Sequence, residues 1–173
     1  MQKSLFLIGA RGSGKSTVGR LIAERLGWHF CDADALLEER AGKSIRAIFN
    51  EEGEAGFRDR EAALLEEIAG GCNQVVATGG GVVLRATNRE LFRRGTVVWL
   101  DAPAETLWQR LQADVTTVER RPDLAQGGLA EIEDVLRVRQ PLYEACADLR
   151  VGAGDRSAAE VADAIVAWLA NRD

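Results

Sequence analysis

A glycine-rich segment near the N-terminus, residues 9–17 with the sequence GARGSGKST, contains the residue types best suited to chemistry. Its spacing matches G-x-x-x-x-G-K-[S/T], a pattern whose backbone N–H groups surround phosphate oxygens. In this pattern Lys15 reaches the β and γ phosphates of a nucleotide, and the Ser16 hydroxyl ligates Mg²⁺. A glycine turn without a ligand would not explain these two residues at the start of a helix. The segment therefore predicts a phosphate-binding loop, or P-loop.

Two carboxylates, Asp32 and Asp34, follow the second apolar segment. In an extended chain residues i and i+2 point to the same side, so both could face the edge of a sheet where α/β folds bind ligands. One acid near Mg²⁺ and one near an acceptor hydroxyl would suit phosphoryl transfer. The alternative is that Asp34 only caps the helix that begins near Ala35.

A third acid, Asp101, follows the apolar residues 97–100 and competes with Asp32 for the magnesium role. An apolar strand that ends in Asp holds Mg²⁺ in many P-loop proteins. Asp101 could equally cap a helix that begins near Pro103. Spacing alone leaves the choice between Asp32 and Asp101 open.

Three consecutive glycines, Gly79, Gly80 and Gly81, follow another apolar segment and would allow a ligand to approach the backbone closely. Arg58 and Arg139 lie in helical patterns and could recognise a carboxylate or phosphate with a planar guanidinium. The alternatives are an ordinary turn for the glycines and solvated surface positions for the arginines.

Short apolar segments alternate with helical patterns along the chain, which predicts an α/β fold with a buried parallel sheet. The predicted strands are 5–8, 28–31, 75–77, 97–100 and 149–151. Ser157 and Glu160 form a capping box before the last helix. Pro141 is expected to end or kink the preceding one. The segment 113–128 has little periodicity and includes Arg120 and Arg121, so we expect a mobile lid there.

Length and composition narrow the class of protein. A chain of 173 residues with 46% hydrophobic and 28% charged residues suits one globular domain. The net charge of −5 argues against a nucleic-acid-binding surface. No apolar run could span a membrane, and we expect no secretory signal and a cytoplasmic location. The three cysteines are expected to be reduced, and a single histidine, His29, excludes a multi-histidine metal site.

Taken together, these motifs resemble those of shikimate kinases, in order and spacing, from about Leu5 to the last helix. The matching pieces are residues 9–17, Asp32-x-Asp34, Phe57-Arg58-x-x-Glu61, the three glycines, Arg121-Pro122 and Arg139-x-x-x-Tyr143. The resemblance implies transfer of a phosphoryl group from ATP to the 3-hydroxyl of shikimate, a step of aromatic amino-acid biosynthesis. It also implies a three-layer P-loop kinase fold with a five-stranded parallel sheet, order 2-3-1-4-5, and a substrate-binding helical region at about 34–61.

The resemblance also implies roles for individual residues. It makes Asp34 the catalytic base, with Lys15 and Arg121 stabilising the transferring group. The implied ATP-binding residues are Gly12, Ser13, Gly14, Lys15, Ser16, Thr17, Arg110, Arg121 and Arg156. The implied shikimate-binding residues are Asp34, Arg58, Gly79, Gly80, Gly81 and Arg139. Ser16 and Asp32 would hold Mg²⁺, and the enzyme would act as a monomer.

Two departures from the family pattern concern the nucleotide side. Asp123 stands where the family usually has an uncharged residue, and Arg120 could compete with Arg121 for the phosphate. Gly152 and Gly154 make the adenine loop, and with it Arg156, hard to align.

A gluconate or nucleoside monophosphate kinase is the nearest alternative function. A regulatory GTPase lacks support because no Asn-Lys-x-Asp motif is present. A catalytically inactive nucleotide-binding module would be expected to lack Lys15, Asp34 or Arg121.

Overall fold

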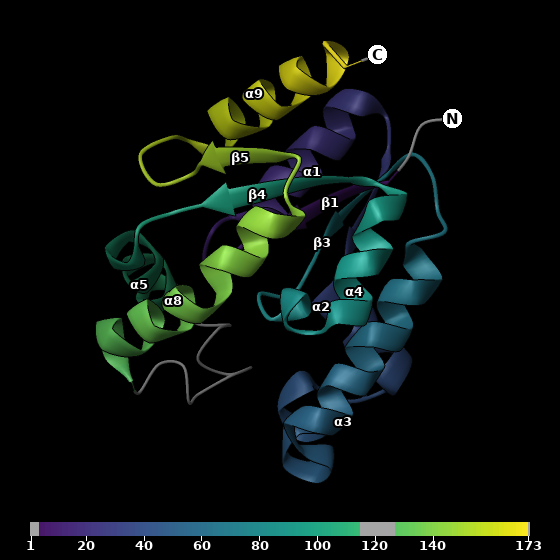
Figure 1. The fold of residues 1–173 in the computed structure, drawn as a ribbon, viewed down its shortest axis with the longest axis vertical. Coiled ribbons are helices and arrows are strands. Elements are labelled where there is room, and N and C mark those ends of the chain that lie inside the picture. The colour runs from purple at the N-terminus through teal and green to yellow at the C-terminus, as the bar shows by residue number, and fades with distance from the viewer. Residues whose placement is uncertain (1–3, 115–126, 173) are drawn as a thin grey trace.

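The computed structural model describes residues 4–114 and 127–172, which form a five-stranded parallel sheet with helices on both faces (Figure 1). The strands lie in the order β2-β3-β1-β4-β5, as the sequence analysis predicted. Their bounds are β1 Leu5–Ile8, β2 His29–Asp32, β3 Gln74–Ala77, β4 Thr96–Asp101 and β5 Leu149–Gly152. Within the described residues, no helix combines the length and apolarity needed to cross a bilayer.

Each face of the sheet has its own hydrophobic core, because successive strand residues point to opposite faces. Leu5 and Leu7 of β1 pack toward α1 (Lys15–Leu26) and α9 (Ala158–Ala170), which cover one face. Phe6 and Ile8 pack into the core on the other face, which α3 (Ile45–Ile68) and α8 (Gly128–Cys146) cover together with α4 (Ala86–Leu91). Burial on both faces explains why the strands are continuously apolar.

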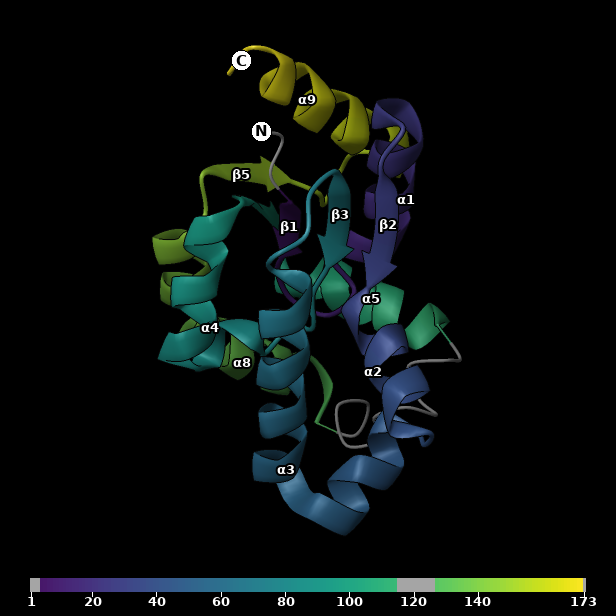
Figure 2. The same ribbon diagram turned by 90° about the vertical axis from the view of Figure 1, so that its right-hand side faces the viewer.

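Helices α2 (Ala33–Ala41) and α3 project beyond the carboxyl ends of β2 and β3 (Figure 2). Ser44 is the N-cap of α3, and its hydroxyl accepts a hydrogen bond from the N–H of Ala47 at 3.1 Å. Gly53 interrupts α3 with φ 70° and ψ −177°, a conformation that side chains strongly disfavour. A separate apolar cluster, which includes Leu37, Ile48 and Phe57, holds the two helices together.

The C-terminal helices follow the sequence signals in part. The capping box of α9 is confirmed, since Ser157 and Glu160 exchange side-chain-to-backbone hydrogen bonds. Of the two effects predicted for Pro141, an end or a kink, the helix end is not observed, because α8 continues to Cys146. Packing of α8 on the sheet therefore outweighs the backbone hydrogen bond that a proline removes.

The connections complete the fold. After β3 the chain forms the short 3₁₀ turn η1 (Val82–Leu84) before α4, and a second turn, η2 (Phe92–Arg94), leads into β4. Helix α5 (Ala104–Ala113) follows β4. Most of the segment expected to be a lid, including Arg120, Arg121 and Asp123, lies outside the described residues.

Candidate active site

The P-loop connects β1 to α1, as predicted. Gly9, Gly12 and Gly14 have φ values of 140°, 83° and 93°, so residues with a Cβ would be strained at all three positions. Gly14 is the N-cap of α1, and no side chain in the described part of the protein caps that helix end. The first N–H groups of α1 are therefore oriented to receive an anion.

Lys15 lies across this loop and is 9% exposed. Its ammonium group donates hydrogen bonds to the carbonyls of Gly9 and Ala10, both at 2.8 Å. Burial removes the charged form from water and lowers the pKa of Lys15 to about 8, although Asp34 and Asp32 act in the opposite direction. The cation is thus held at the loop with carbonyl partners that a phosphate could replace.

Asp32 connects the P-loop to α2. Its carboxylate accepts a hydrogen bond from the Ser16 hydroxyl at 2.6 Å and from the backbone N–H groups of Asp34 and Ala35 at 3.1 Å. Asp32 is therefore the N-cap of α2, and the alternative that Asp34 caps this helix is wrong. Asp34 lies in the first helical turn, so the extended-chain argument for a shared side does not apply either.

Asp101, the competing acid, faces a different neighbour. Its Oδ2 atom accepts hydrogen bonds from Nε and Nη2 of Arg150 at 3.0 and 2.6 Å. The same guanidinium lies over the Trp99 ring. The structure thus brings Asp32, and not Asp101, into contact with the P-loop serine, which spacing alone could not decide.

The three glycines after β3 lie where the acidic and basic side chains converge. A Cβ at Gly79 would come within 3.1 Å of Oδ1 of Asp34 and 2.8 Å of Oε1 of Glu61. A Cβ at Gly80 would lie 3.4 Å from Nη1 of Arg139. A Cβ at Gly81 would overlap with the guanidinium of Arg58. The missing side chains are what allow this turn and its charged neighbours to approach closely.

Arg58 and Glu61 form a buried ion pair one turn apart on α3. Each residue is 6% exposed, and Nη1 of Arg58 donates to Oε2 of Glu61 at 2.7 Å. The Nε atom of Arg58 is buried without a hydrogen-bond partner in the described structure. A buried polar hydrogen without a partner is costly, so this guanidinium can gain energy from an incoming acceptor.

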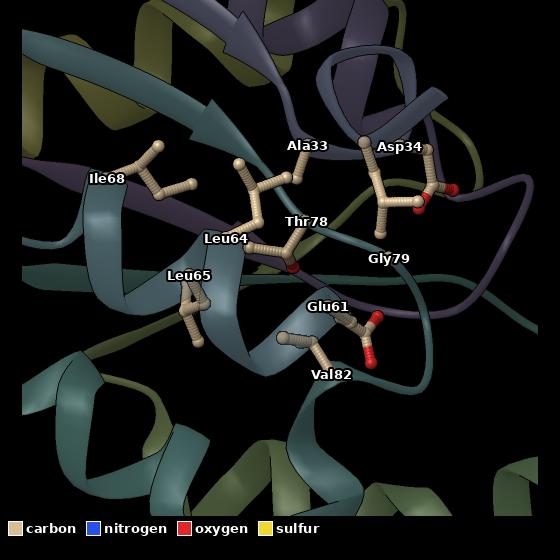
Figure 3. Close-up of a pocket in the computed structure, with 10 residues that line it drawn as sticks. Ala33, Asp34, Glu61, Leu64, Leu65, Ile68, Thr78, Gly79 and Val82 are labelled. Carbon is tan, nitrogen blue, oxygen red and sulfur yellow. The ribbon is translucent and has the colours of Figure 1, made fainter. Parts of the chain in front are cut away.

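A pocket lies beside the glycine turn (Figure 3). The carboxylates of Asp34 and Glu61 lie at the end near Gly79, and apolar side chains such as Leu64 and Ile68 lie toward the other end. The lining residues are Ala33, Asp34, Leu37, Glu61, Leu64, Leu65, Ile68, Thr78, Gly79 and Val82.

Two further arginines expected near the nucleotide differ in their contacts. Arg110 donates to the carbonyl of Gly12 at 3.2 Å and to that of Ala153 at 2.7 Å, which joins the P-loop to the loop after β5. The hydrogen bond of Arg156 goes instead to the carbonyl of Glu160 on α9, at 3.0 Å. The geometry brings Arg110 to the P-loop but leaves Arg156 on the exposed surface.

Comparison with known proteins decides the family, because the family model for shikimate kinase matches residues 11–170. The chain belongs to the shikimate kinase family. The shikimate kinase of Symbiobacterium thermophilum is 45% identical over 171 residues, which cover 98% of this chain and 97% of the relative. That of Gloeobacter violaceus is 50% identical over 151 residues, covering 87% and 83%.

Solved structures agree with this assignment. The shikimate kinase from Acinetobacter baumannii in complex with shikimate has a TM-score of 0.94 at 36% identity and covers 100% of this chain and 96% of its own. A gluconokinase from Sinorhizobium meliloti reaches a TM-score of 0.62 at 22% identity, covering 98% and 93%, and shares only the fold. The predicted enzyme class, an ATP-dependent shikimate kinase, and the predicted P-loop kinase fold are confirmed.

Three residues near the glycine turn received no role in the sequence analysis, although Glu61 and Tyr143 were quoted there within family motifs. Glu61 holds Arg58, and its i+3 spacing on one helix is a signal that could have found it. Tyr143 donates a hydrogen bond to the carbonyl of Gly80 and follows Arg139 by one turn, a second such signal. Asn88 donates to the carbonyl of Val82 at 2.9 Å, a tertiary contact that no local pattern announces.

Proposed function

We propose that the chain carries out its family's reaction, phosphorylation of the 3-hydroxyl of shikimate by ATP, with the residues gathered around the glycine turn and the P-loop. The observation that carries the proposal is the convergence of Asp34, Arg58 and Arg139 on Gly79, Gly80 and Gly81. One acid and two guanidinium groups suit a substrate that has both a hydroxyl and a carboxylate.

On the nucleotide side, we assign the ATP phosphates to the P-loop. The proposed contacts are the backbone and side chains of Gly12, Ser13, Gly14, Lys15, Ser16 and Thr17. Arg110 would help to shape the adenine site through its contacts with the loop after β5. Arg156 is assigned to the same site, and Arg121 to the transferring phosphoryl group from a lid at 113–128.

The donor atoms beside the P-loop fit a magnesium ion. The Ser16 hydroxyl and the Asp32 carboxylate are hard oxygen ligands in contact with each other, and Mg²⁺ is usually bound by one or two such groups plus water and phosphate. We propose that Ser16 ligates the ion and that Asp32 orients its hydration shell. When bound, Mg²⁺ would neutralise charge on the β and γ phosphates.

On the acceptor side, Arg58 and Arg139 would bind the shikimate carboxylate, with the backbone of the glycine turn against the ring. Glu61 keeps the Arg58 guanidinium in place for this contact. Asp34 would accept the proton of the reacting hydroxyl as its oxygen attacks the γ phosphorus. Holding the acceptor in line removes much of the entropic cost of the reaction.

The remaining proposals concern the whole chain. We propose that residues 1–173 form one kinase domain whose region 34–61 binds shikimate, and that the enzyme acts as a monomer in the cytoplasm. Its net charge of −5 supports small-molecule substrates over nucleic acid, and a membrane partner is not expected.

A coupled ADP-release assay with shikimate, gluconate and AMP tests the substrate. We expect turnover with shikimate, little with the other two acceptors, and almost none when Lys15 is changed to Ala, because a cation at the phosphates is lost. Equal or faster turnover of gluconate or AMP would overturn the assignment. Normal activity of Lys15→Ala would remove Lys15 from the mechanism.

A further inference from the structure

Tyr143 is a buried residue of α8 that reaches the glycine turn. The residue is 0% exposed, and its hydroxyl donates a hydrogen bond of 2.5 Å to the carbonyl of Gly80. Its ring packs within the core against Trp99, with ring centroids 5.8 Å apart. Because the ring is fixed by this packing, the hydroxyl has little freedom to move to another hydrogen-bond partner.

Arg139, which lies one helical turn earlier on α8, approaches the same glycine. Nη1 of Arg139 would lie 3.4 Å from a Cβ built at Gly80, the same residue whose carbonyl accepts the hydrogen bond from Tyr143. Burial raises the pKa of Tyr143 to about 12, against the opposing effect of Arg139. The hydroxyl therefore keeps its proton, and can donate to Gly80, throughout the neutral range.

The hydrogen bond from Tyr143 to Gly80 affects two parts of the proposed shikimate site. Because a peptide group is planar, a fixed carbonyl at Gly80 also fixes the direction of the N–H of Gly81. Gly81 in turn lies directly against the guanidinium of Arg58. A displacement of the Gly80 carbonyl would thus affect the turn, Arg139 and the neighbour of Arg58 together.

We propose that Tyr143 is a positioning residue that sets the affinity for shikimate by holding the Gly80 carbonyl, and with it the glycine turn beside which Arg139 lies. The inference rests on the proposed function of Arg139 as a carboxylate ligand. It assigns no contact between Tyr143 and the substrate itself. Its effect should appear in substrate binding, since a fixed carboxylate clamp contributes equally before and during the reaction.

The Tyr143→Phe variant removes only the hydroxyl and keeps the ring that packs on Trp99. We expect KM for shikimate to rise about tenfold, as the loss of one well-placed hydrogen bond implies. KM for ATP and kcat at saturating shikimate should stay within about threefold of the parent values, because the P-loop is untouched. Calorimetric titration with shikimate in the absence of ATP should show the same loss of affinity.

Ser4→Ala is the matched control. Ser4 is 1% exposed and donates a 2.9 Å hydrogen bond to the carbonyl of Gly71, where the chain enters β1, away from the glycine turn. Both variants should lower the melting temperature, but only Tyr143→Phe should raise KM for shikimate. An equal rise in both variants, or a KM for Tyr143→Phe within twofold of the parent, would overturn the inference.

Arg139→Met and the double variant separate the inference from the proposed function. If Tyr143 acts through Arg139, the double variant should be less impaired than the two single effects multiplied. A raised KM for Arg139→Met with full multiplication of the effects overturns the inference alone. An unchanged KM for Arg139→Met overturns the proposed role of Arg139, and the inference with it.

Discussion

Asp32 and Asp34 are two residues apart, yet the start of α2 gives them different neighbours. Asp32 is the N-cap and contacts Ser16, whereas Asp34 belongs to the first turn and lies beside Gly79. A helix begins between them, so one acid is directed to the P-loop and the other to the glycine turn. This divergence supports separate roles, with Asp32 near the metal and Asp34 near the acceptor.

Changing Asp34 to Asn should lower kcat by at least about a hundredfold, because the acceptor proton loses its base. ATP affinity should be almost unchanged, since the phosphates bind elsewhere, and the cap of α2 should persist because Asp32 supplies it. Steady-state kinetics with nucleotide binding by calorimetry measures both effects. A kcat within about tenfold of the parent would remove Asp34 from the mechanism.

The magnesium assignment predicts unequal effects for two aspartates. Asp32→Ala should raise the Mg²⁺ concentration needed for half-maximal activity, because the contact with the proposed ligand Ser16 is lost. Asp101→Ala serves as the control, since its carboxylate pairs with Arg150 instead. A Mg²⁺ titration of both variants that gives the opposite ranking would contradict the assignment.

Tyr143 is the single tyrosine of the chain, so tyrosinate absorbance reports its ionisation directly. Its pKa is raised from 10.0 to about 12 in the folded protein. Between these two pH values the folded protein keeps the phenol proton, whereas the unfolded chain loses it. The stabilisation from the neutral phenol is therefore lost as the pH rises from about 10 to 12. Tyr143→Phe should lack both the absorbance change and this part of the decline in stability. A native midpoint near 10 would contradict the buried, neutral hydroxyl.

At the scale of elements, the turn between β3 and η1 acts as the surface against which the charged side chains pack. Gly81→Ala would add a methyl group that overlaps with the guanidinium of Arg58 and displaces it. Because Arg58 is a proposed carboxylate ligand, we expect KM for shikimate to rise at least about tenfold. Gly152→Ala in β5 is the control, because nothing lies within 4 Å of its added Cβ. Equal kinetics for the two variants would show that Arg58 can move aside without loss.

At the scale of the whole molecule, the P-loop and the α2–α3 projection lie beside the same end of the sheet (Figure 2), and we propose that they bind different ligands. Each ligand should therefore slow hydrogen exchange in a different part of the chain. A non-hydrolysable ATP analogue should protect the start of α1, and shikimate should protect α2 and α3. Helix α9, which packs on the sheet face away from α3, should be unchanged. Uniform protection by either ligand would contradict two separate binding regions.

Local residue patterns were sufficient for much of this fold and for the chemical groups in the site. The glycine spacing of residues 9–17 predicted the P-loop because only glycine tolerates its φ values. Continuous apolar segments predicted buried parallel strands, and resemblance to a family supplied the strand order. Arg58 and Arg139 were predicted as a pair of ligands through the same resemblance. The roles of these residues remain predictions.

Contacts between distant segments decided the rest. Strand order alone would not have placed Asp32 rather than Asp101 at Ser16, because β4 pairs with β1 whereas β2 does not. The contacts decide it, since Asp32 accepts from Ser16 and Asp101 pairs with Arg150. The passage of α8 through Pro141 depends on packing energy that exceeds a local backbone penalty. The hydrogen bond from Tyr143 to Gly80 joins residues 63 positions apart, so no local pattern could have disclosed it. Spacing along the chain predicts which groups are present, and the packing of helices on the sheet determines which of them meet.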